Sequence, residues 1–248
     1  MSDPLPKIIA VVGITASGKT DLAIELAKEF NGELVSCDSR QMYKEMEIGT
    51  NKDRSFPHHL MDIVYPNERF TVADFQKVAY ETIDEILSRG KLPILVGGTA
   101  MYVTAILENW QIPDGKGEPR YDALLVAPTV PRPVVYERIN NRVGAMIKEG
   151  LVEEVKQIAE KYGYKTVAMT GHAYQQIAKY LLGEWSLEKA IEESKKVTRN
   201  YAKRQWTWWG KPATADKPEN QPGPHGLVHW VKNKDEAFSL VRDFLNIS

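Results

Sequence analysis

The segment Gly13–Thr20 reads G-I-T-A-S-G-K-T, which fits the pattern G-x-x-x-x-G-K-[ST] of a phosphate-binding loop, or P-loop. It follows a short apolar run at Lys7–Val12 and precedes Lys19–Phe30, where apolar residues recur at helical spacing. In such a unit the glycines let the backbone wrap around one anion, and the start of the helix adds its positive end. The sequence therefore predicts a strand, an anion-binding loop and a helix in succession.

This loop indicates a site for a diphosphate or triphosphate group. Lys19 supplies a mobile positive charge to phosphoryl oxygens, and the Thr20 hydroxyl is placed to bind Mg²⁺, the cofactor that we expect. The predicted phosphate-binding residues are Gly13, Ile14, Thr15, Ala16, Ser17, Gly18, Lys19 and Thr20. The pattern alone does not specify which reaction follows.

The first half of the chain alternates apolar segments with amphipathic ones. Glu33–Cys37, Leu92–Val96 and Asp122–Ala127 are predicted strands, and Thr71–Arg89 has the apolar spacing of a helix. Because strands and helices alternate, we expect parallel strands with helices on both faces of the sheet. The predicted class is α/β: a P-loop NTPase-like parallel sheet flanked by helices.

The second half is predicted to be mostly helical. The expected elements are helices at Pro133–Lys148, Leu151–Tyr162, Gly171–Leu182, Ser186–Trp209 and Glu236–Leu245, an exposed loop at Lys211–Pro224 and a strand at Leu227–Val231. No internal repeat or low-complexity segment separates the two halves. Residues 1–248 are therefore interpreted as a single P-loop α/β domain.

Composition excludes some classes of protein. The net charge of −1 argues against a uniformly basic protein that coats nucleic acid, but not against a local basic patch. Cys37 is the only cysteine, so no internal disulfide can form and a reducing, cytoplasmic location is expected. The first residues lack the basic start of a secretory leader, and no apolar run is long enough to cross a membrane. We expect no membrane partner and a monomer.

Asp38 is the only acid that closes an early predicted strand. Phosphoryl transfer from ATP usually needs a second acidic Mg²⁺ ligand, but Leu92–Val96 ends in Gly97-Gly98-Thr99 without a carboxylate. A transfer that breaks a C–O bond to diphosphate needs instead a base near the acceptor, and a carboxylate suits an adenine amine. Asp38 fits that role, although an Asp before Ser is as often a cap with no chemistry.

Several longer motifs occur in one consistent order over most of the chain. They are GITASGKTDLAIELA at Gly13–Ala27, NGELVSCDSRQMYKEMEIGTNK at Asn31–Lys52, PHHLMDI at Pro57–Ile63, FTVADFQ at Phe70–Gln76, LPILVGGTAMYVTAILE at Leu92–Glu108, YERINNRVGAMIKEGLVEEV at Tyr136–Val155 and TRNYAKRQWTWW at Thr198–Trp209. In these motifs the sequence resembles the tRNA dimethylallyltransferases, also called tRNA isopentenyltransferases.

The resemblance implies transfer of a dimethylallyl group from dimethylallyl diphosphate to N6 of adenosine 37, beside the anticodon of tRNAs that read codons starting with U. It implies that the P-loop and Arg199 hold the diphosphate, that Asp38 is the general base, and that Thr99 bonds near the reacting atoms. The target adenine would be flipped out of its stack. The residues that would contact the tRNA around it are Asp38, Ser39, Arg40, Gln41 and Thr99.

The last long predicted helix carries a basic stripe, with no acid between Lys195 and Lys211. Lys195, Arg199 and Lys203 follow one another at intervals of four residues, so they share one line of the helix surface. Lys203 and Arg204 are the residues of this stripe that we expect to bind tRNA phosphates. The tryptophans between them are interpreted as core residues.

Bacterial members of the family usually carry a helical insertion that clasps the anticodon stem. In this chain the short linker 112–120 stands where that insertion would lie. A second interpretation is therefore open, because adenylate isopentenyltransferases, which make cytokinin precursors from AMP, ADP or ATP, resemble the same core and can lack the insertion. A P-loop small-molecule kinase and an inactive RNA-binding domain are further alternatives.

Overall fold

The computed structural model describes residues 4–212, 221–222 and 227–247. The centre of the fold is a parallel sheet with the strand order β10-β7-β1-β4-β2-β3. Its strands are β1 (Lys7–Val11), β2 (Gly32–Ser36), β3 (His58–His59), β4 (Leu92–Val96), β7 (Asp122–Pro128) and β10 (His229–Val231). The parallel α/β fold predicted from the alternating pattern is therefore confirmed.

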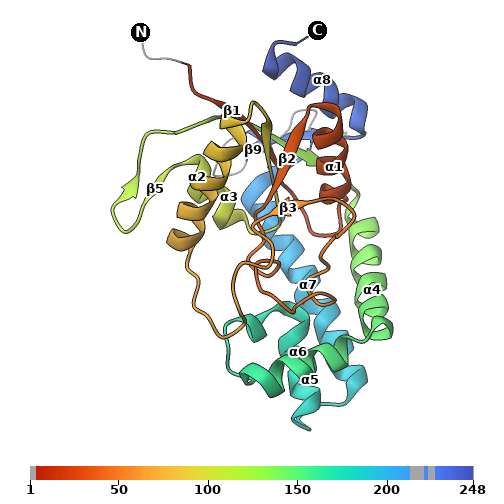
Figure 1. Cartoon of the computed structure of the whole chain (residues 1–248). Helices are drawn as coiled ribbons and strands as arrows, with labels where there is room; N and C mark the ends of the chain where they lie inside the picture. Colours follow the sequence, from red (N-terminus) through yellow and green to blue (C-terminus); the bar gives the residue numbers. More distant parts are fainter. Residues whose placement is uncertain (1–3, 213–220, 223–226, 248) are drawn as a thin grey trace.

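Helices cover both faces of this sheet (Figure 1). The helices on one face are α1 (Lys19–Glu29) and α8 (Lys234–Leu245), and those on the other are α2 (Val72–Ser88), α3 (Ala100–Leu107) and α7 (Leu187–Trp209). Alternate residues of β1 enter the two cores: Ile8 and Ala10 face α2 and α3, whereas Ile9 and Val11 face α1. Burial on both faces explains why this strand is a continuous apolar run.

The helical part of the chain extends away from the sheet at one end (Figure 1). It consists of α4 (Arg132–Glu149), α5 (Leu151–Tyr162), a 3₁₀ turn (Ala168–Thr170), α6 (His172–Leu181) and the first half of α7. Gly150, with φ of 106°, separates α4 from α5, because it adopts the left-handed conformation that ends a helix. Since α7 begins in this part and ends against the sheet, it joins the two.

Two short antiparallel hairpins complete the described elements. They are β5 (Trp110–Gln111) with β6 (Gly115–Lys116), and β8 (Gly210–Lys211) with β9 (Gln221–Pro222). The β5–β6 hairpin contains most of the linker 112–120. Most of the predicted loop at Lys211–Pro224 lies outside the described residues. Within the described ranges, no helix has both the length and the apolar character that crossing a bilayer requires.

The sequence pattern located most elements within two residues of their observed bounds. It did not predict β3, because two histidines carry no apolar alternation, and it named no helix at α3.

The sheet order shows which strand ends lie next to one another. Since β1, β4 and β2 are neighbours, their carboxyl ends bring together the P-loop, the turn at Gly97-Gly98-Thr99 and Asp38.

The contact between the ends of β2 and β4 leaves no room for a side chain at Gly97. A Cβ atom there would lie 2.3 Å from backbone atoms of Cys37, whose N–H donates to the carbonyl of Val96 at 2.8 Å. Cys37 itself is fully buried, and burial raises the pKa of its thiol. It is thus a packed core residue and not a nucleophile.

We therefore expect Gly97→Ala to lower the free energy of unfolding by about 2–4 kcal/mol, because the two strand ends must separate. The matched control is Gly144→Ala in α4, because a Cβ atom there would meet nothing within 4 Å. Alanine favours the helix over glycine, so this variant should raise the free energy of unfolding by up to about 1 kcal/mol. Thermal or urea unfolding of both variants measures the effect. An unchanged midpoint for Gly97→Ala would contradict the close approach.

Candidate active site

The P-loop connects β1 to α1 at the carboxyl edge of the sheet. Its backbone turns through left-handed conformations, with φ of 114° at Gly13, 62° at Ala16 and 88° at Gly18. Gly18 precedes the first turn of α1, and no side chain caps this end of the helix. The first N–H groups of α1 are therefore available to an anion.

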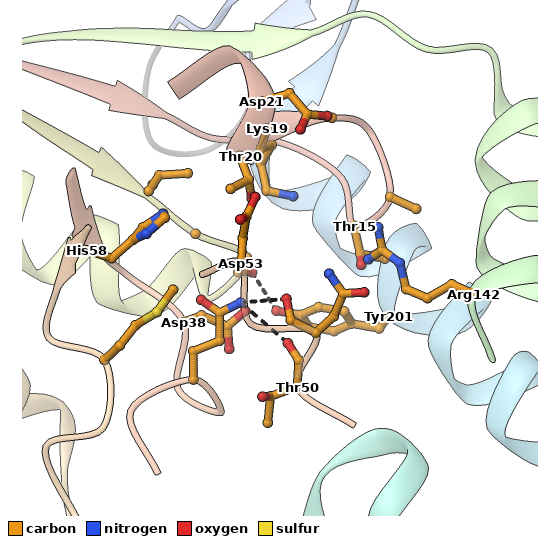
Figure 2. A pocket seen from close by; sticks show the side chains of 18 residues that line it. Thr15, Lys19, Thr20, Asp21, Asp38, Thr50, Asp53, His58, Arg142 and Tyr201 are labelled. Atoms are coloured by element: carbon orange, nitrogen blue, oxygen red, sulfur yellow. Dashed lines mark hydrogen bonds between the residues drawn. The ribbon is translucent and has the colours of Figure 1, made fainter. Parts of the chain in front are cut away.

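The Lys19 ammonium folds back over the loop and donates to the carbonyl of Ile14 at 2.6 Å. Burial lowers the pKa of Lys19 to about 8, while the carboxylate of Asp38 opposes that shift and Arg142 adds to it. Figure 2 shows the ammonium pointing into the space below the P-loop. A desolvated cation in this position gains strongly from an anionic ligand, which replaces interactions lost on burial.

Asp38 lies just beyond β2, where the chain turns away from the sheet. Its Oδ1 accepts the backbone N–H of Arg40 at 2.9 Å, which fixes that oxygen within the turn. Its Oδ2 lies towards Gly98, 3.5 Å from the place where a Cβ atom of that residue would stand. Asp38 is thus a turn residue, as one interpretation of the sequence held, and it also presents an oxygen to the site.

Thr99 ties the end of β4 to the Asp38 turn. Its N–H donates to the carbonyl of Cys37 at 3.1 Å, and its hydroxyl oxygen accepts the N–H of Ser39 at 2.9 Å. The same hydroxyl donates to Ser39 Oγ at 3.1 Å. Thr99 therefore lies beside Asp38, and these bonds hold the turn in place.

Two side chains of helix α7 form hydrogen bonds to the backbone of the site. The buried side chain of Gln205 accepts the N–H of Thr15 at 2.7 Å and donates from Nε2 to the carbonyl of Gly98 at 2.9 Å. The Tyr201 hydroxyl donates to the same carbonyl. One helix thus connects the P-loop to the turn after β4. No role was predicted for Gln205 or Tyr201 from the sequence.

A cavity of about 190 Å³ lies between the P-loop and the ends of β2 and β4. Its wall includes the carboxylates of Asp21, Asp38 and Asp53 and the cationic groups of Lys19 and Arg142. In Figure 2, Arg142 extends inward from the side of α4, towards Thr15. We call this the P-loop cavity.

A second cavity of about 350 Å³ adjoins the first. One wall is apolar and consists of Ile139, Val143 and Met146, which lie on one face of α4. Asp38 and Arg142 line both cavities. We call this the helical cavity, and Asp38 stands where it meets the P-loop cavity.

Polar and aromatic groups form the rest of the helical cavity. The ring of His172 lies 4.6 Å from that of Tyr201, and the guanidinium of Arg204 lies 5.6 Å from the same tyrosine ring. Burial lowers the pKa of His172 to about 4, and the charges of Arg40 and Arg204 contribute. His172 is therefore neutral near pH 7, and the positive charge of this wall comes from arginine.

The residues predicted to bind tRNA do not all lie together. Ser39, Arg40 and Arg204 line the helical cavity, whereas Gln41 lines the P-loop cavity. Arg40 donates to the carbonyl of Val167 at 2.9 Å, so it also attaches the Asp38 turn to the helical part.

Lys203 lines neither cavity. It lies in a separate groove with Arg132 and Trp206, and its ammonium donates to Asn200 at 3.3 Å.

The basic stripe predicted on α7 is shorter than its sequence indicates, because acids pair with its first two lysines. Lys195 pairs with Glu192 at 2.7 Å, and Lys196 pairs with Glu193 at 3.1 Å. These acids lie one turn earlier, just outside the acid-free stretch of sequence, and they neutralise the beginning of the stripe. The stripe is therefore not one continuous basic surface.

Arg199, predicted to hold the diphosphate, donates to Asn140 Oδ1 at 2.6 Å and is not among the residues that line either cavity. Arg142 lines the P-loop cavity instead, and no role was predicted for it from the sequence. The signal was present in the motif R-I-N-N-R at 138–142, where two arginines four residues apart follow a P-loop core.

The segment after the Asp38 turn was also missed as part of the site. Thr50 and Asn51 line both cavities, and Asp53 and His58 line the P-loop cavity. Glu154 of α5 anchors this segment by accepting three consecutive N–H groups, those of residues 47–49, at 2.8, 2.7 and 3.0 Å. Sequence spacing could not predict a contact between segments about a hundred residues apart.

The described residues contain no group of three or more His, Cys, Asp or Glu side chains arranged to hold a metal. His58 and His59 face opposite ways: His58 lines the P-loop cavity, and His59 Nε2 lies 2.7 Å from Glu33 Oε2. Thr20 lies in the wall of the P-loop cavity, where the sequence predicts a Mg²⁺ ligand. A cation there would rely on few protein oxygens, together with water and a ligand.

Two family models match the sequence. One, described as IPP transferase, matches residues 41–123 and 110–212, and the other, described as isopentenyl transferase, matches residues 6–65. The first match therefore has two parts. One part ends near the β5–β6 hairpin and the other begins there. Together these matches cover most of the chain.

Close relatives agree with these matches. A tRNA dimethylallyltransferase of Acetivibrio thermocellus is 35% identical over an alignment that covers 94% of this chain and 93% of the relative. That alignment spans 305 positions, more than the 248 residues of this chain, so the relative has residues without a counterpart here. One from Alkaliphilus oremlandii is 35% identical and covers 96% of each chain.

A solved structure indicates the same family. The full-length tRNA isopentenylpyrophosphate transferase of Bacillus halodurans superposes with a TM-score of 0.83 and is 31% identical, with 97% of this chain and 95% of that one covered. The family that the sequence motifs predicted is thus confirmed by sequence and by fold. This chain belongs to the tRNA dimethylallyltransferase family.

Proposed function

We propose that this chain transfers a dimethylallyl group from dimethylallyl diphosphate to N6 of adenosine 37 in tRNAs that read codons starting with U. The observation that carries the proposal is the position of Asp38 where the P-loop cavity meets the helical cavity. A carboxylate at that point can face a diphosphate-bearing donor on one side and an amine acceptor on the other.

In the proposed reaction, the C–O bond between the allylic carbon and diphosphate breaks, and a C–N bond to the amine forms. The electron pair of the broken bond leaves with diphosphate, where the loop N–H groups and Lys19 stabilise the added charge. Asp38 accepts a proton from the amine as its nitrogen becomes positive. The fixed Oδ1 of Asp38 leaves Oδ2 for this role.

The residues around the P-loop fit a magnesium ion. The wall of that cavity carries three carboxylates against two cationic side chains, so a diphosphate would add negative charge to an already negative wall. Mg²⁺ would neutralise part of that charge on the diphosphate when bound. The Thr20 hydroxyl and the Asp53 carboxylate are oxygen donors of the kind that Mg²⁺ prefers.

The helical cavity suits a flipped adenine with phosphates beside it. Tyr201 and His172 offer aromatic rings, while Arg40 and Arg204 offer positive charge to the flanking backbone. The proposed enzyme is a monomer. With tRNA as its acceptor, the enzyme would act in the cytoplasm.

The linker 112–120 supports a compact member of the family. The split match to the IPP transferase model and the 305-position alignment both fit the absence of an inserted domain near the β5–β6 hairpin. Without that domain, the grip on the anticodon stem would depend on the core alone. This leaves adenylate isopentenyl transfer as the second candidate, because a free nucleotide needs no such grip.

Transfer of radiolabel from dimethylallyl diphosphate with Mg²⁺ distinguishes the two acceptors. An unmodified tRNA with adenines at positions 36 and 37 and free AMP are tested in parallel. We expect label in the tRNA. Label in AMP alone would move the protein to the cytokinin-forming branch, and label in neither, with ATP hydrolysed instead, would refute prenyl transfer.

We expect Asp38→Asn to lower the single-turnover rate by about 10²- to 10⁴-fold while affinity for dimethylallyl diphosphate stays nearly unchanged. The amide oxygen can still accept the Arg40 N–H, so the turn is kept and only basicity is lost. Asp38→Ala, which also loses the turn contact, should be at least as slow. Prenyl transfer by Asp38→Asn at the wild-type rate would exclude Asp38 as the base.

Lys19 should make diphosphate binding depend on pH. Its pKa of about 8 in the free protein means that it is charged below pH 8 and loses its proton above it. Because only the charged form attracts the anion, affinity for dimethylallyl diphosphate, measured without acceptor, should fall above pH 8 by up to about tenfold per pH unit. Lys19→Arg stays charged and should abolish this decline; the same decline in that variant would contradict the assignment.

A further inference from the structure

His58 lies in the wall of the P-loop cavity, but the proposed reaction gives it no role. It belongs to the edge strand β3, whose register pairs it with Leu34 of β2. The side chain is partly buried, and Figure 2 shows its ring on the opposite side of the cavity from Arg142. A side chain with two polar nitrogens therefore borders the space in which the proposed function places a diphosphate.

One contact fixes which ring nitrogen of His58 carries a hydrogen. Nδ1 lies 2.8 Å from the carbonyl oxygen of Phe56. A carbonyl can only accept a hydrogen bond, so Nδ1 is the donor. Burial lowers the pKa of His58, which keeps the ring neutral near pH 7. Nε2 is then left with a lone pair, and within residues 4–212, 221–222 and 227–247 it has no hydrogen-bond partner.

The turn before β3 also fixes the carboxylate of Asp53. Its Oδ1 accepts the N–H of Ser55 at 2.8 Å, and its charge acts on His58 from nearby. Backbone groups of the turn thus hold two acceptors at the P-loop cavity, a carboxylate and a neutral ring nitrogen. Thr20 lies in the wall of the same cavity.

The lone pair at Nε2 excludes most direct partners in this cavity. The ionised oxygens of a diphosphate and of Asp53 are themselves acceptors, so they cannot donate to Nε2. Mg²⁺ prefers oxygen ligands to imidazole, which disfavours direct coordination by His58. Water bound to Mg²⁺ is a suitable partner, because its oxygen faces the ion and its hydrogens point outward. Mg²⁺ usually keeps several such waters.

We propose that His58 is a positioning residue for hydrated Mg²⁺: its Nε2 accepts a hydrogen bond from a water molecule of the ion that neutralises the diphosphate of the prenyl donor. This role rests on the proposed function. Thr20 and Asp53 offer oxygens to the same ion, and His58 orients its water. Loss of a group that orients the ligands of a metal typically lowers metal affinity by about 10- to 100-fold.

The test uses two amide variants that replace different nitrogens of the ring. In His58→Asn the amide can still donate to the carbonyl of Phe56, but no acceptor remains at the position of Nε2. In His58→Gln the longer side chain places an amide oxygen near that position. His59→Asn is the matched control, because His59 lies in the same strand, contacts Glu33 at 2.7 Å and is not among the residues that line the P-loop cavity.

Calorimetry of each variant measures the affinity for inorganic diphosphate, without acceptor, at several concentrations of free Mg²⁺ and with EDTA. We expect His58→Asn to need about tenfold more Mg²⁺ to reach half of the effect of the ion, with a metal-free affinity within about twofold of the wild type. His58→Gln should recover most of the magnesium dependence, and His59→Asn should match the wild type. A merely structural role for His58 would lower the metal-free affinity as well. Thermal unfolding checks that each variant is folded.

The proposal is overturned if folded His58→Asn keeps the wild-type dependence on Mg²⁺, if its metal-free affinity falls equally, or if His58→Gln is as impaired as His58→Asn. If His58→Asn does not fold, His58→Phe, which keeps a ring and lacks both nitrogens, takes its place in the comparison.

The role of His58 and the proposed function fail separately. Magnesium-dependent diphosphate binding that needs His58, with no label transferred by the wild type, would refute the proposed function alone. Transfer of label to tRNA by the wild type, with an unchanged magnesium dependence in His58→Asn, would refute the role of His58 alone.

Discussion

The buried amide of Gln205 is the contact on which the geometry of the site depends most. With its two ends it bonds the P-loop N–H of Thr15 and the carbonyl of Gly98, so one side chain sets the distance between the anion site and the turn beside Asp38. Each bond replaces water at a buried backbone group. Loss of the amide would leave the Thr15 N–H unsatisfied and the Gly98 carbonyl with the Tyr201 hydroxyl alone. The long helix α7 therefore holds the P-loop and the turn after β4 at a fixed distance from each other.

The helical part also positions residues that line the two cavities. The carboxylate of Glu154 holds three N–H groups of the segment 47–49, and the Tyr174 hydroxyl donates to the same carboxylate. The ring of Tyr174 fills the space beside Gly49, where a Cβ atom would lie only 2.4 Å from it. Through these contacts α5 and α6 position the walls that Thr50 and Asn51 give to both cavities.

Most of the fold could be predicted from the sequence, because apolar periodicity and the P-loop depend on residues close together in the chain. The position of Asp38 beside Thr99 could be anticipated from topology, because the two residues follow the ends of predicted parallel strands. The arrangement of arginines could not, because spacing along α7 does not reveal that Arg199 would meet Asn140 while Arg142 of α4 faces the loop. Such choices depend on which helices pack together.

The close approach at Gly97 has a consequence for how such an enzyme can change. Asp38 is aimed by backbone contacts at the ends of β2 and β4, whereas the walls of the helical cavity are side chains of α4, α6 and α7. Mutations can therefore reshape the helical cavity without moving the Asp38 carboxylate or the P-loop. One arrangement of carboxylate and phosphate-binding loop can in this way be combined with helical cavities of different size and shape.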